Sequence, residues 1–378
     1  GVMVNTTSGE PGSASEFYIR GISTFGGRKT PLILLDDVEI SSTDLNNIPA
    51  ETIESFSILK DASATAIYGS RGANGVMLVT TKSGQENTKT QINVTVENSF
   101  QSMMNFPKFV DGATWMELYN EGQRNRGATS LMYSQERIDN TRNKVNPYVY
   151  PDVNWRDLLF KDMAMSQRAN VNLQGGGSRV SYYMSLNVNH DSGLLDSPQI
   201  YSFNNNINNL SYNFQNNLQV KVTPTTKIRL NMNAQIQNRK GPNYKTHTTM
   251  RIDQTLDFVT KGLSANALIH FKNTSSQAFT RSIEPYYYRI TKWTPGTDQY
   301  DMERLGTSGT EYIYTSDISR YTERTITMQF QLDYKRQFGM HNVGGMLMYM
   351  QRDFKRDVLP NRNQGFSGRF TYDYGQRY

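Results

Sequence analysis

Residues 53–84 read IESFSILKDASATAIYGSRGANGVMLVTTKSG, and this stretch predicts a small α/β unit. The segment 53–59 is a candidate strand. Asp61 then precedes a short helix-compatible run as an N-cap does, and Gly69 ends the expected helix after about two turns. The apolar run 76–79 follows a glycine-rich turn and predicts a strand buried on both faces.

The segment upstream supports the same unit. Residues 32–35 form another short apolar run, ended by Asp36 and Asp37, which also suits a strand buried on both faces. Downstream, the polar tetrapeptide 83–86 reads as a linker. We therefore expect a first domain at residues 1–85 and a second domain at residues 86–378.

From residue 90 onward the hydrophobic period changes to two. Apolar or aromatic residues occupy alternate positions while the intervening positions are mostly polar, as in antiparallel strands with one apolar face. Eight such stripes lie at 92–100, 180–188, 210–222, 228–236, 263–271, 326–334, 343–349 and 366–374. This pattern is typical of a membrane β-barrel, whose strands alternate apolar outward and polar inward residues.

The connections alternate in length, as outer-membrane barrels require. We expect short turns at 175–178, 223–226, 259–262 and 337–342, and long segments at 101–167, 191–209, 239–250, 273–322 and 352–365. The alternation requires a strand before 175 and another near 250–258, which makes ten. A barrel wide enough to hold an 85-residue domain needs about 22 strands. Ten strands are then part of the wall, completed by a longer chain or by a second polypeptide.

The composition excludes several classes of protein. The hydrophobic share is 37% and the mean hydropathy is -0.63, and no apolar run approaches the ~18 residues of a spanning helix. The chain has no cysteine, which excludes disulfides and cysteine nucleophiles. Its 40 Lys and Arg face 34 Asp and Glu without a dense basic run, so we expect no nucleic-acid partner.

No residue pattern indicates catalysis. The four histidines have no metal-ligand spacing. Gly175 to Gly177 lacks the Lys and Ser or Thr of a phosphate loop, and the neighbouring carboxylates Asp36 and Asp37 have no partner base. We predict no catalytic residue, no metal and no cofactor, and hence a protein that is not an enzyme.

Several motifs together resemble the SusC/RagA family of TonB-dependent outer-membrane transporters. They are EFYIRGISTF at 16–25, PLILLDDVEI at 31–40, the stretch 53–84, YPDVNWRDLLF at 150–160, GGGSRVSYYMSLNVNHDSGLL at 175–195, FVTKGL at 258–263 and RNQGFSGRFTYDY at 362–374. The resemblance covers most of the chain. One departure is Asp37, where the family usually has glycine. An aspartate tolerates a left-handed turn better than most residues.

The resemblance implies a small α/β plug domain inside a large antiparallel transmembrane β-barrel. It implies active import of oligosaccharides or oligopeptides across the outer membrane of a Gram-negative, Bacteroidetes-type bacterium. The expected partners are a SusD-like surface lipoprotein that covers the extracellular mouth, and the TonB-ExbB-ExbD complex, which would pull on a segment upstream of Gly1. The assembly is expected to be a dimer of transporter-lid pairs in the lipid bilayer.

The resemblance also singles out individual residues. Those of the plug signature are Arg20, Gly21, Asp36, Asp61, Gly69, Arg71 and Gly72. The two arginines could pair with carboxylates such as Asp36, Glu54 or Asp61, either as structural ion pairs or as a latch that holds the plug in the barrel.

Candidate contacts with substrate or lid protein lie in two segments. Thr24, Phe25 and Arg28 belong to a loop that would face the lumen, for which an ordinary flexible turn is the alternative. Tyr287 and Trp293 lie in the long segment 273–322, where packing of the loop on itself is the alternative.

Two other functions remain open on sequence alone. A passive porin is disfavoured by the folded domain that precedes the barrel. In an adhesive or structural outer-membrane barrel, the plug would be permanent and the long loops would bind a surface.

Overall fold

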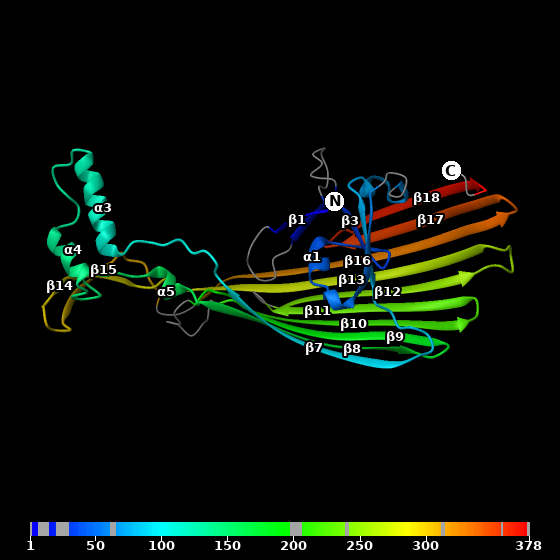
Figure 1. Cartoon of the computed structure of the whole chain (residues 1–378), viewed down its shortest axis with the longest axis horizontal. Helices are drawn as coiled ribbons and strands as arrows, with labels where there is room; N and C mark the ends of the chain where they lie inside the picture. Colours follow the sequence, from blue (N-terminus) through cyan, green and yellow to red (C-terminus); the bar gives the residue numbers. More distant parts are fainter. Residues whose placement is uncertain are drawn as a thin grey trace.

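The computed structural model describes residues 2–6, 15–19, 30–60, 66–196, 206–238, 242–310, 314–356 and 358–375. We call residues up to 85 the plug and residues from 86 onward the wall. The plug contains a four-stranded sheet, and the wall contains a ten-stranded sheet (Figure 1). None of the helices in these ranges combines the length and the apolar content needed to cross a bilayer.

The plug sheet has the order β4-β3-β6-β5. These strands are β3 (Leu32–Leu35), β4 (Val38–Ile40), β5 (Ile53–Leu59) and β6 (Val76–Thr81). The three strands expected from the apolar runs are therefore confirmed. The central pair, β3 and β6, is parallel, while the outer pairings are antiparallel.

The two central plug strands are continuous apolar runs because both of their faces are covered. Ile33 and Met77 join a buried cluster on one face of the sheet. Leu32, Leu34 and Val76 form the cluster on the other face, and Val76 is fully buried. Alternation along the strand thus supplies both halves of a small core.

A two-residue turn joins β3 to β4. Its residues, Asp36 and Asp37, have φ values of 47° and 72°. Such a turn needs positive φ at both positions, and the short polar side chain of aspartate tolerates that conformation. The expectation that an aspartate at position 37 tolerates a left-handed turn is confirmed.

Most of the two-turn helix expected after β5 lies outside the described ranges. Residues 61–65 lie outside the described ranges, and the described remainder, Ala66–Gly72, is a 3-10 helix. Gly69 interrupts it with a φ of 58°. The structure adds elements that were not predicted: β1 (Val2–Thr6), β2 (Ser15–Ile19), α1 (Ser42–Asn46) and the 3-10 turn Ala50–Thr52.

The wall is a fully antiparallel sheet of ten strands, as the alternation of turns and loops predicted. Its order is β18-β17-β16-β13-β12-β11-β10-β9-β8-β7. The bounds are β7 (Thr88–Ser102), β8 (Met163–Gly176), β9 (Val180–Ser192), β10 (Asn208–Thr223), β11 (Thr226–Asn238), β12 (Pro242–Thr255), β13 (Leu263–Ser282), β16 (Tyr314–Phe338), β17 (His341–Lys355) and β18 (Asn361–Tyr374).

The four predicted short turns lie at one end of the wall, on the right of Figure 1, and the long connections lie at the other end, on the left. Two loop predictions were wrong. The segment 239–250 is mostly strand, because β12 begins at Pro242, and this strand also replaces the one expected near 250–258. The connection at 352–365 shrinks to residues 356–360 because β17 and β18 extend beyond their apolar stripes.

The wall has one apolar face and one polar face. Val94 and Val96 of β7 are 66% and 70% exposed, although both are apolar. On β9, Leu186 is also exposed, whereas its neighbours Ser185 and Asn187 are buried. The polar face is covered by the plug, which reverses the arrangement of a water-soluble protein.

The long connections carry an extension beyond the end of the sheet (Figure 1). It contains α3 (Gly112–Asn125), α4 (Gln135–Arg142), α5 (Trp155–Leu159) and a hairpin of β14 (Tyr287–Trp293) with β15 (Tyr300–Leu305). The side chains of Asn146 and Tyr300 form a hydrogen bond of 3.0 Å, which joins the helical segment to the hairpin. None of these elements was predicted.

Candidate functional site at the plug–wall interface

Charged pairs join the plug to the wall with a consistent polarity. Among the described residues, six ion pairs connect the wall strands to the plug or to the linker 83–86, and in each the carboxylate comes from the plug or the linker and the cation comes from a wall strand. The pairs are Asp37–Arg251, Glu39–Arg352, Asp44–Lys245, Asp44–Lys272, Glu51–Arg168 and Glu86–Lys221.

Asp44 is the most buried of these carboxylates, with 2% of its surface exposed. It lies in the first turn of α1, where it forms a capping box with Ser41. Its two oxygens also accept hydrogen bonds from Lys245 at 3.0 Å and Lys272 at 2.6 Å. Burial raises the pKa of this carboxyl, but the two lysine charges outweigh burial and hold the pKa well below its ordinary value.

Glu39 of β4 is likewise shared by two cations. Arg71 of the plug lies 2.6 Å from the carboxylate, and Arg352 of β17 lies 3.3 Å from it. One plug carboxylate therefore links a plug arginine to a wall arginine.

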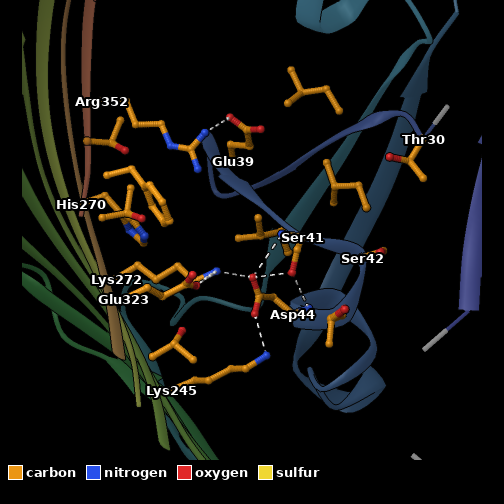
Figure 2. A pocket seen from close by; sticks show the side chains of 18 of the residues that line it. Thr30, Glu39, Ser41, Ser42, Asp44, Lys245, His270, Lys272, Glu323 and Arg352 are labelled. Atoms are coloured by element: carbon orange, nitrogen blue, oxygen red, sulfur yellow. Dashed lines mark hydrogen bonds and ion pairs between the residues drawn. The ribbon is translucent and has the colours of Figure 1, made fainter. Parts of the chain in front are cut away.

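A cavity of about 580 Å³ lies between these two clusters (Figure 2). The plug contributes the end of the segment before β3, the strand β4 and the start of α1, while β12, β13, β16 and β17 contribute the wall side. Lys245 and Lys272 point from the wall toward Asp44, and Arg352 points toward Glu39 (Figure 2). The cavity is thus lined by charged and hydroxyl groups of both parts.

A second polar cluster lies nearer the short turns. Asp36 accepts hydrogen bonds from the Thr81 amide at 2.9 Å, the Thr81 hydroxyl at 2.6 Å and the Asn231 side chain at 3.1 Å. Asn217 donates to the Thr81 hydroxyl and to the Lys82 carbonyl, both at 2.7 Å. Burial raises the pKa of the Asp36 carboxyl, although the hydrogen bonds from Thr81 and Asn231 act in the opposite direction.

The linker lies directly on the wall backbone. A Cβ atom at Gly84 would collide with the backbone of Tyr182 in β9. The neighbouring Tyr183 is fully buried, and its hydroxyl donates to the Glu51 carbonyl of the plug at 3.3 Å. Glycine at position 84 therefore permits a close approach that a larger residue would prevent.

Amide side chains cover much of the wall's inner face. They line a second cavity of about 380 Å³ beside the plug residues 46–50, and they include Asn189, Asn209, Asn213, Gln235 and Gln237. Their neutral donors and acceptors resemble those of water, so water can replace their protein partners on this face.

The structure brings two histidines together. His247 and His270 lie on adjacent strands with ring centroids 5.7 Å apart, a proximity that the scattered sequence positions did not indicate. Within the described ranges, no group of three or more His, Cys, Asp or Glu is arranged to hold a metal ion.

Comparison with known proteins identifies the two parts. Residues 1–76 match the family model of the TonB-dependent receptor plug domain. TonB-dependent receptor P26 of Formosa agariphila is 35% identical over 236 residues, which cover 62% of this chain and 22% of that protein. TonB-dependent receptor SusC of Bacteroides thetaiotaomicron is 27% identical over 249 residues, which cover 64% and 22%. The matched region is thus about a fifth of the length of these relatives.

The solved structures extend the likeness over the whole chain. The RagAB peptide transporter superposes with a TM-score of 0.75 at 16% identity, covering 100% of this chain and 50% of that one. The siderophore receptor PirA of Acinetobacter baumannii gives 0.53 at 14% identity, covering 95% and 45%. The plug-domain match and these likenesses support a TonB-dependent receptor of the SusC/RagA type. Its ten-stranded sheet is accordingly part of the receptor barrel, with the plug against the inner face.

Some of the residues singled out from the sequence lie outside the described ranges, and others have partners that differ from those expected. Arg20, Gly21, Thr24, Phe25, Arg28 and Asp61 lie outside the described ranges. Arg71 pairs with Glu39 and not with Asp36 or Glu54, the described carboxylates that were suggested from the sequence. Asp36 instead bonds to Thr81 and Asn231.

Both residues proposed for the long loop lie in the β14–β15 hairpin. The ring of Tyr287 is 63% exposed, while the Trp293 indole donates to the Thr297 carbonyl at 2.9 Å within the loop. The β14–β15 hairpin lies in the extension beyond the end of the sheet, away from the plug (Figure 1).

Sequence reasoning missed the charged groups at the centre of the interface. Lys245 and Lys272 lie at diagonal positions on β12 and β13, where Lys245 is opposite Thr274 and Lys272 is opposite His247, and both occupy inward positions of the period-two pattern. A lysine at an inward position of a strand could have indicated this site, because a charge on the inner face of the wall must be paired with an opposite charge. The partner, Asp44, lies 201 residues from Lys245 in the chain, and only the fold brings the two together.

Proposed function

We propose that this receptor actively imports a large nutrient, an oligosaccharide or an oligopeptide, across the outer membrane of a Gram-negative, Bacteroidetes-type bacterium. The observation that carries the proposal is the polarity of the plug–wall interface, in which plug carboxylates meet wall cations over an amide-rich surface. The likeness to SusC and to the RagAB peptide transporter supports the same class of function.

A polar interface suits a plug that must move. Separating apolar surfaces costs roughly 25 cal/mol for each Å² exposed to water. Ion pairs and amides can instead exchange their protein partners for water, so the net cost of separation is smaller. A force applied by TonB-ExbB-ExbD upstream of Gly1 would therefore remodel the plug without unfolding the wall.

The latch is assigned to the ion pairs of the plug signature and of the wall. Arg71, Glu39 and Arg352 form its outer part, and Asp36 contributes through Thr81. Gly69 and Gly72 shape the 3-10 segment that carries Arg71. Arg20, Gly21 and Asp61 are proposed as further members from the sequence resemblance.

The extension at the long-loop end is proposed to meet a SusD-like surface lipoprotein. Tyr287 is an exposed aromatic residue there, and Trp293 shapes the same hairpin. Thr24, Phe25 and Arg28 are proposed as substrate contacts on the plug. The complete assembly is proposed to be a dimer of transporter-lid pairs, and the receptor itself performs no chemistry on its cargo.

An engineered crosslink tests whether the plug must move. The chain lacks cysteine, so a Thr81→Cys, Asn217→Cys pair introduces a single site whose parent side chains are 2.7 Å apart. Oxidation, or a short bifunctional thiol reagent, should block TonB-dependent uptake, and a reductant should restore uptake after oxidation. The matched control is Asn93→Cys with Asn172→Cys, which joins β7 to β8 within the wall at a parent distance of 3.1 Å.

Uptake measurements separate this function from its alternatives. In cells that lack TonB or carry a protonophore, import by the proposed mechanism should stop. A passive porin would continue to conduct. An adhesive barrel would show no uptake in either condition, and the plug–wall crosslink would leave its surface binding unchanged.

A further inference from the structure

We propose that the cavity of Figure 2 binds an anionic group of the imported ligand, a carboxylate or a sulfate. The inference deepens the proposed function and rests on it for the direction from which the ligand arrives. Binding itself is a property of the cavity and can be measured without transport.

The cavity lies on the side of the plug that faces the long loops. Its lining residue Asn243 is near the beginning of β12, Tyr321 is in the early part of β16, and Arg352 is near the end of β17. All three strand regions lie toward the extension and away from the short turns (Figure 1). A ligand that enters past the long loops reaches this cavity before the plug has moved.

The cationic side chains of the cavity have N–H donors that the nearby carboxylates do not use. Asp44 is shared by Lys245 and Lys272, Glu323 lies 4.0 Å from Lys272, and Glu39 is shared by Arg71 and Arg352. Lys245 uses one of its N–H donors on Asp44, and Arg352 reaches Glu39 through one nitrogen at 3.3 Å. Most of their donors have no protein partner among the described residues, and a carboxylate or sulfate is the natural acceptor for such groups.

Buried polar atoms around the same cavity also lack partners. These atoms are the Nε2 of His270, the hydroxyl of Thr274 and the side-chain oxygen of Asn243. His270 can donate from Nε2 because its Nδ1 lies 2.7 Å from the Thr249 hydroxyl and can accept from it. Unpartnered buried groups are costly, so this set indicates a site that a polar ligand completes.

The volume fits one charged residue of a larger ligand. About 580 Å³ is within the range of small-molecule sites, roughly 300–1,000 Å³. Donors on the lysine side would hold the anionic group, and the Asn243 oxygen would accept from a hydroxyl or amide of the same residue. An acidic sugar and an acidic peptide residue share this chemistry.

Anion binding would weaken the hold on the plug. A ligand carboxylate at Lys245 and Lys272 competes with Asp44, the carboxylate that fixes α1 to the wall. A bound ligand would thus weaken the ion pairs that hold the plug against the wall. The same competition gives the inference its sharpest test, because the lysines and the aspartate must act in opposite directions.

The test is calorimetric binding to the detergent-solubilised receptor at its full natural length. Trigalacturonate and a Glu-containing tripeptide serve as the anionic probes, their methyl esters as neutral matches, and sodium sulfate as the free anion. At least one anionic probe should bind about tenfold more tightly than its ester, the typical effect of one charge-assisted hydrogen bond. Whether the saccharide or the peptide binds better identifies the source of the anionic group.

Variants locate the site. Lys272→Gln should weaken binding of the anionic probe about tenfold. Asp44→Asn, which keeps the shape of the side chain but removes the competing charge, should strengthen it. Lys221→Gln is the matched control, because Lys221 also pairs with a carboxylate outside the wall strands, Glu86, but does not line this cavity.

Three results would overturn the inference: equal affinity for acids and esters, no binding of any anionic probe, or a change of the same sign in Lys272→Gln and Asp44→Asn. Uptake that fails in the absence of TonB addresses the proposed function separately. The receptor could therefore prove to be an importer whose cavity binds no anion, and the two results would remain distinguishable.

Discussion

Replacing Asp44 with alanine is expected to release α1 from the wall while the barrel strands stay intact. The substitution leaves Lys245 and Lys272 facing each other, with only 12% and 15% of their side-chain surface exposed. It also removes the capping box with Ser41. Removing one partner of a buried ion pair costs about 3–5 kcal/mol, and we take the lower value because both lysines retain some contact with water.

Hydrogen exchange measures this loss residue by residue. A cost of about 3 kcal/mol corresponds to roughly 150-fold faster exchange where local opening is sampled. The reporting amides are those of Leu45, Asn47 and Ile48, whose hydrogen bonds lie within α1 and the turn that follows it. Amides of the wall strands should keep their wild-type exchange rates.

The matched control is Glu303→Ala in the β14–β15 hairpin. Glu303 pairs with Arg289 at 2.6 Å, the same distance as Asp44 to Lys272, but both of its side chains are more than half exposed. An exposed pair contributes about 0.2–1 kcal/mol, so exchange in the hairpin should rise severalfold at most. Asp44→Ala could instead raise amide exchange in α1 by no more than Glu303→Ala raises it in the β14–β15 hairpin. That result would show that burial does not strengthen the ion pairs of Asp44.

Three further outcomes are expected. Gly84→Val should prevent the linker from lying on the Tyr182 backbone and expose the linker to trypsin in the folded receptor; unchanged digestion would contradict the close approach. The pKa of Asp44 is lowered in the folded protein, so its carboxylate stabilises the fold at every pH above the ordinary carboxyl pKa of about 3.9. This stabilisation is lost as the pH falls through the lowered pKa of the folded state. The pKa of Asp36 is raised, so its contribution increases on acidification, and protection of the plug amides between pH 7 and pH 5 should not decrease. Val94→Arg should destabilise the barrel in lipid by about 2–4 kcal/mol by urea titration, whereas an exposed valine of a soluble protein would tolerate the change.

The plug strands and the wall could be predicted because local patterns determine them. Apolar runs such as 32–35 and 76–79 favour a buried strand, and a stripe with a period of two lies within eight of the ten wall strands. The errors occurred where the local pattern is weak. β12 carries polar residues at most positions, as in Lys245, Thr246, His247 and Thr248, so its apolar stripe was too faint to set its limits.

The helices of the extension were missed for a related reason. The hydrophobic contacts of α3 are few, and Ala113, Met116 and Ile138 form a small cluster with α4 that no neighbouring core supports. A short amphipathic segment inside a long loop gives little signal against its polar surroundings.

Local patterns in the amino-acid sequence were enough to predict the strands of the wall and a separate N-terminal unit, because hydrophobic period and turn chemistry act over a few residues. Which charges meet depends instead on the three-dimensional fold. Asp44 and Lys272 are 228 residues apart, and no local rule relates them. Their pairing depends on the position of the plug against the inner face of the wall. There a charged side chain has little contact with water, so it is stable only when it is paired with an opposite charge.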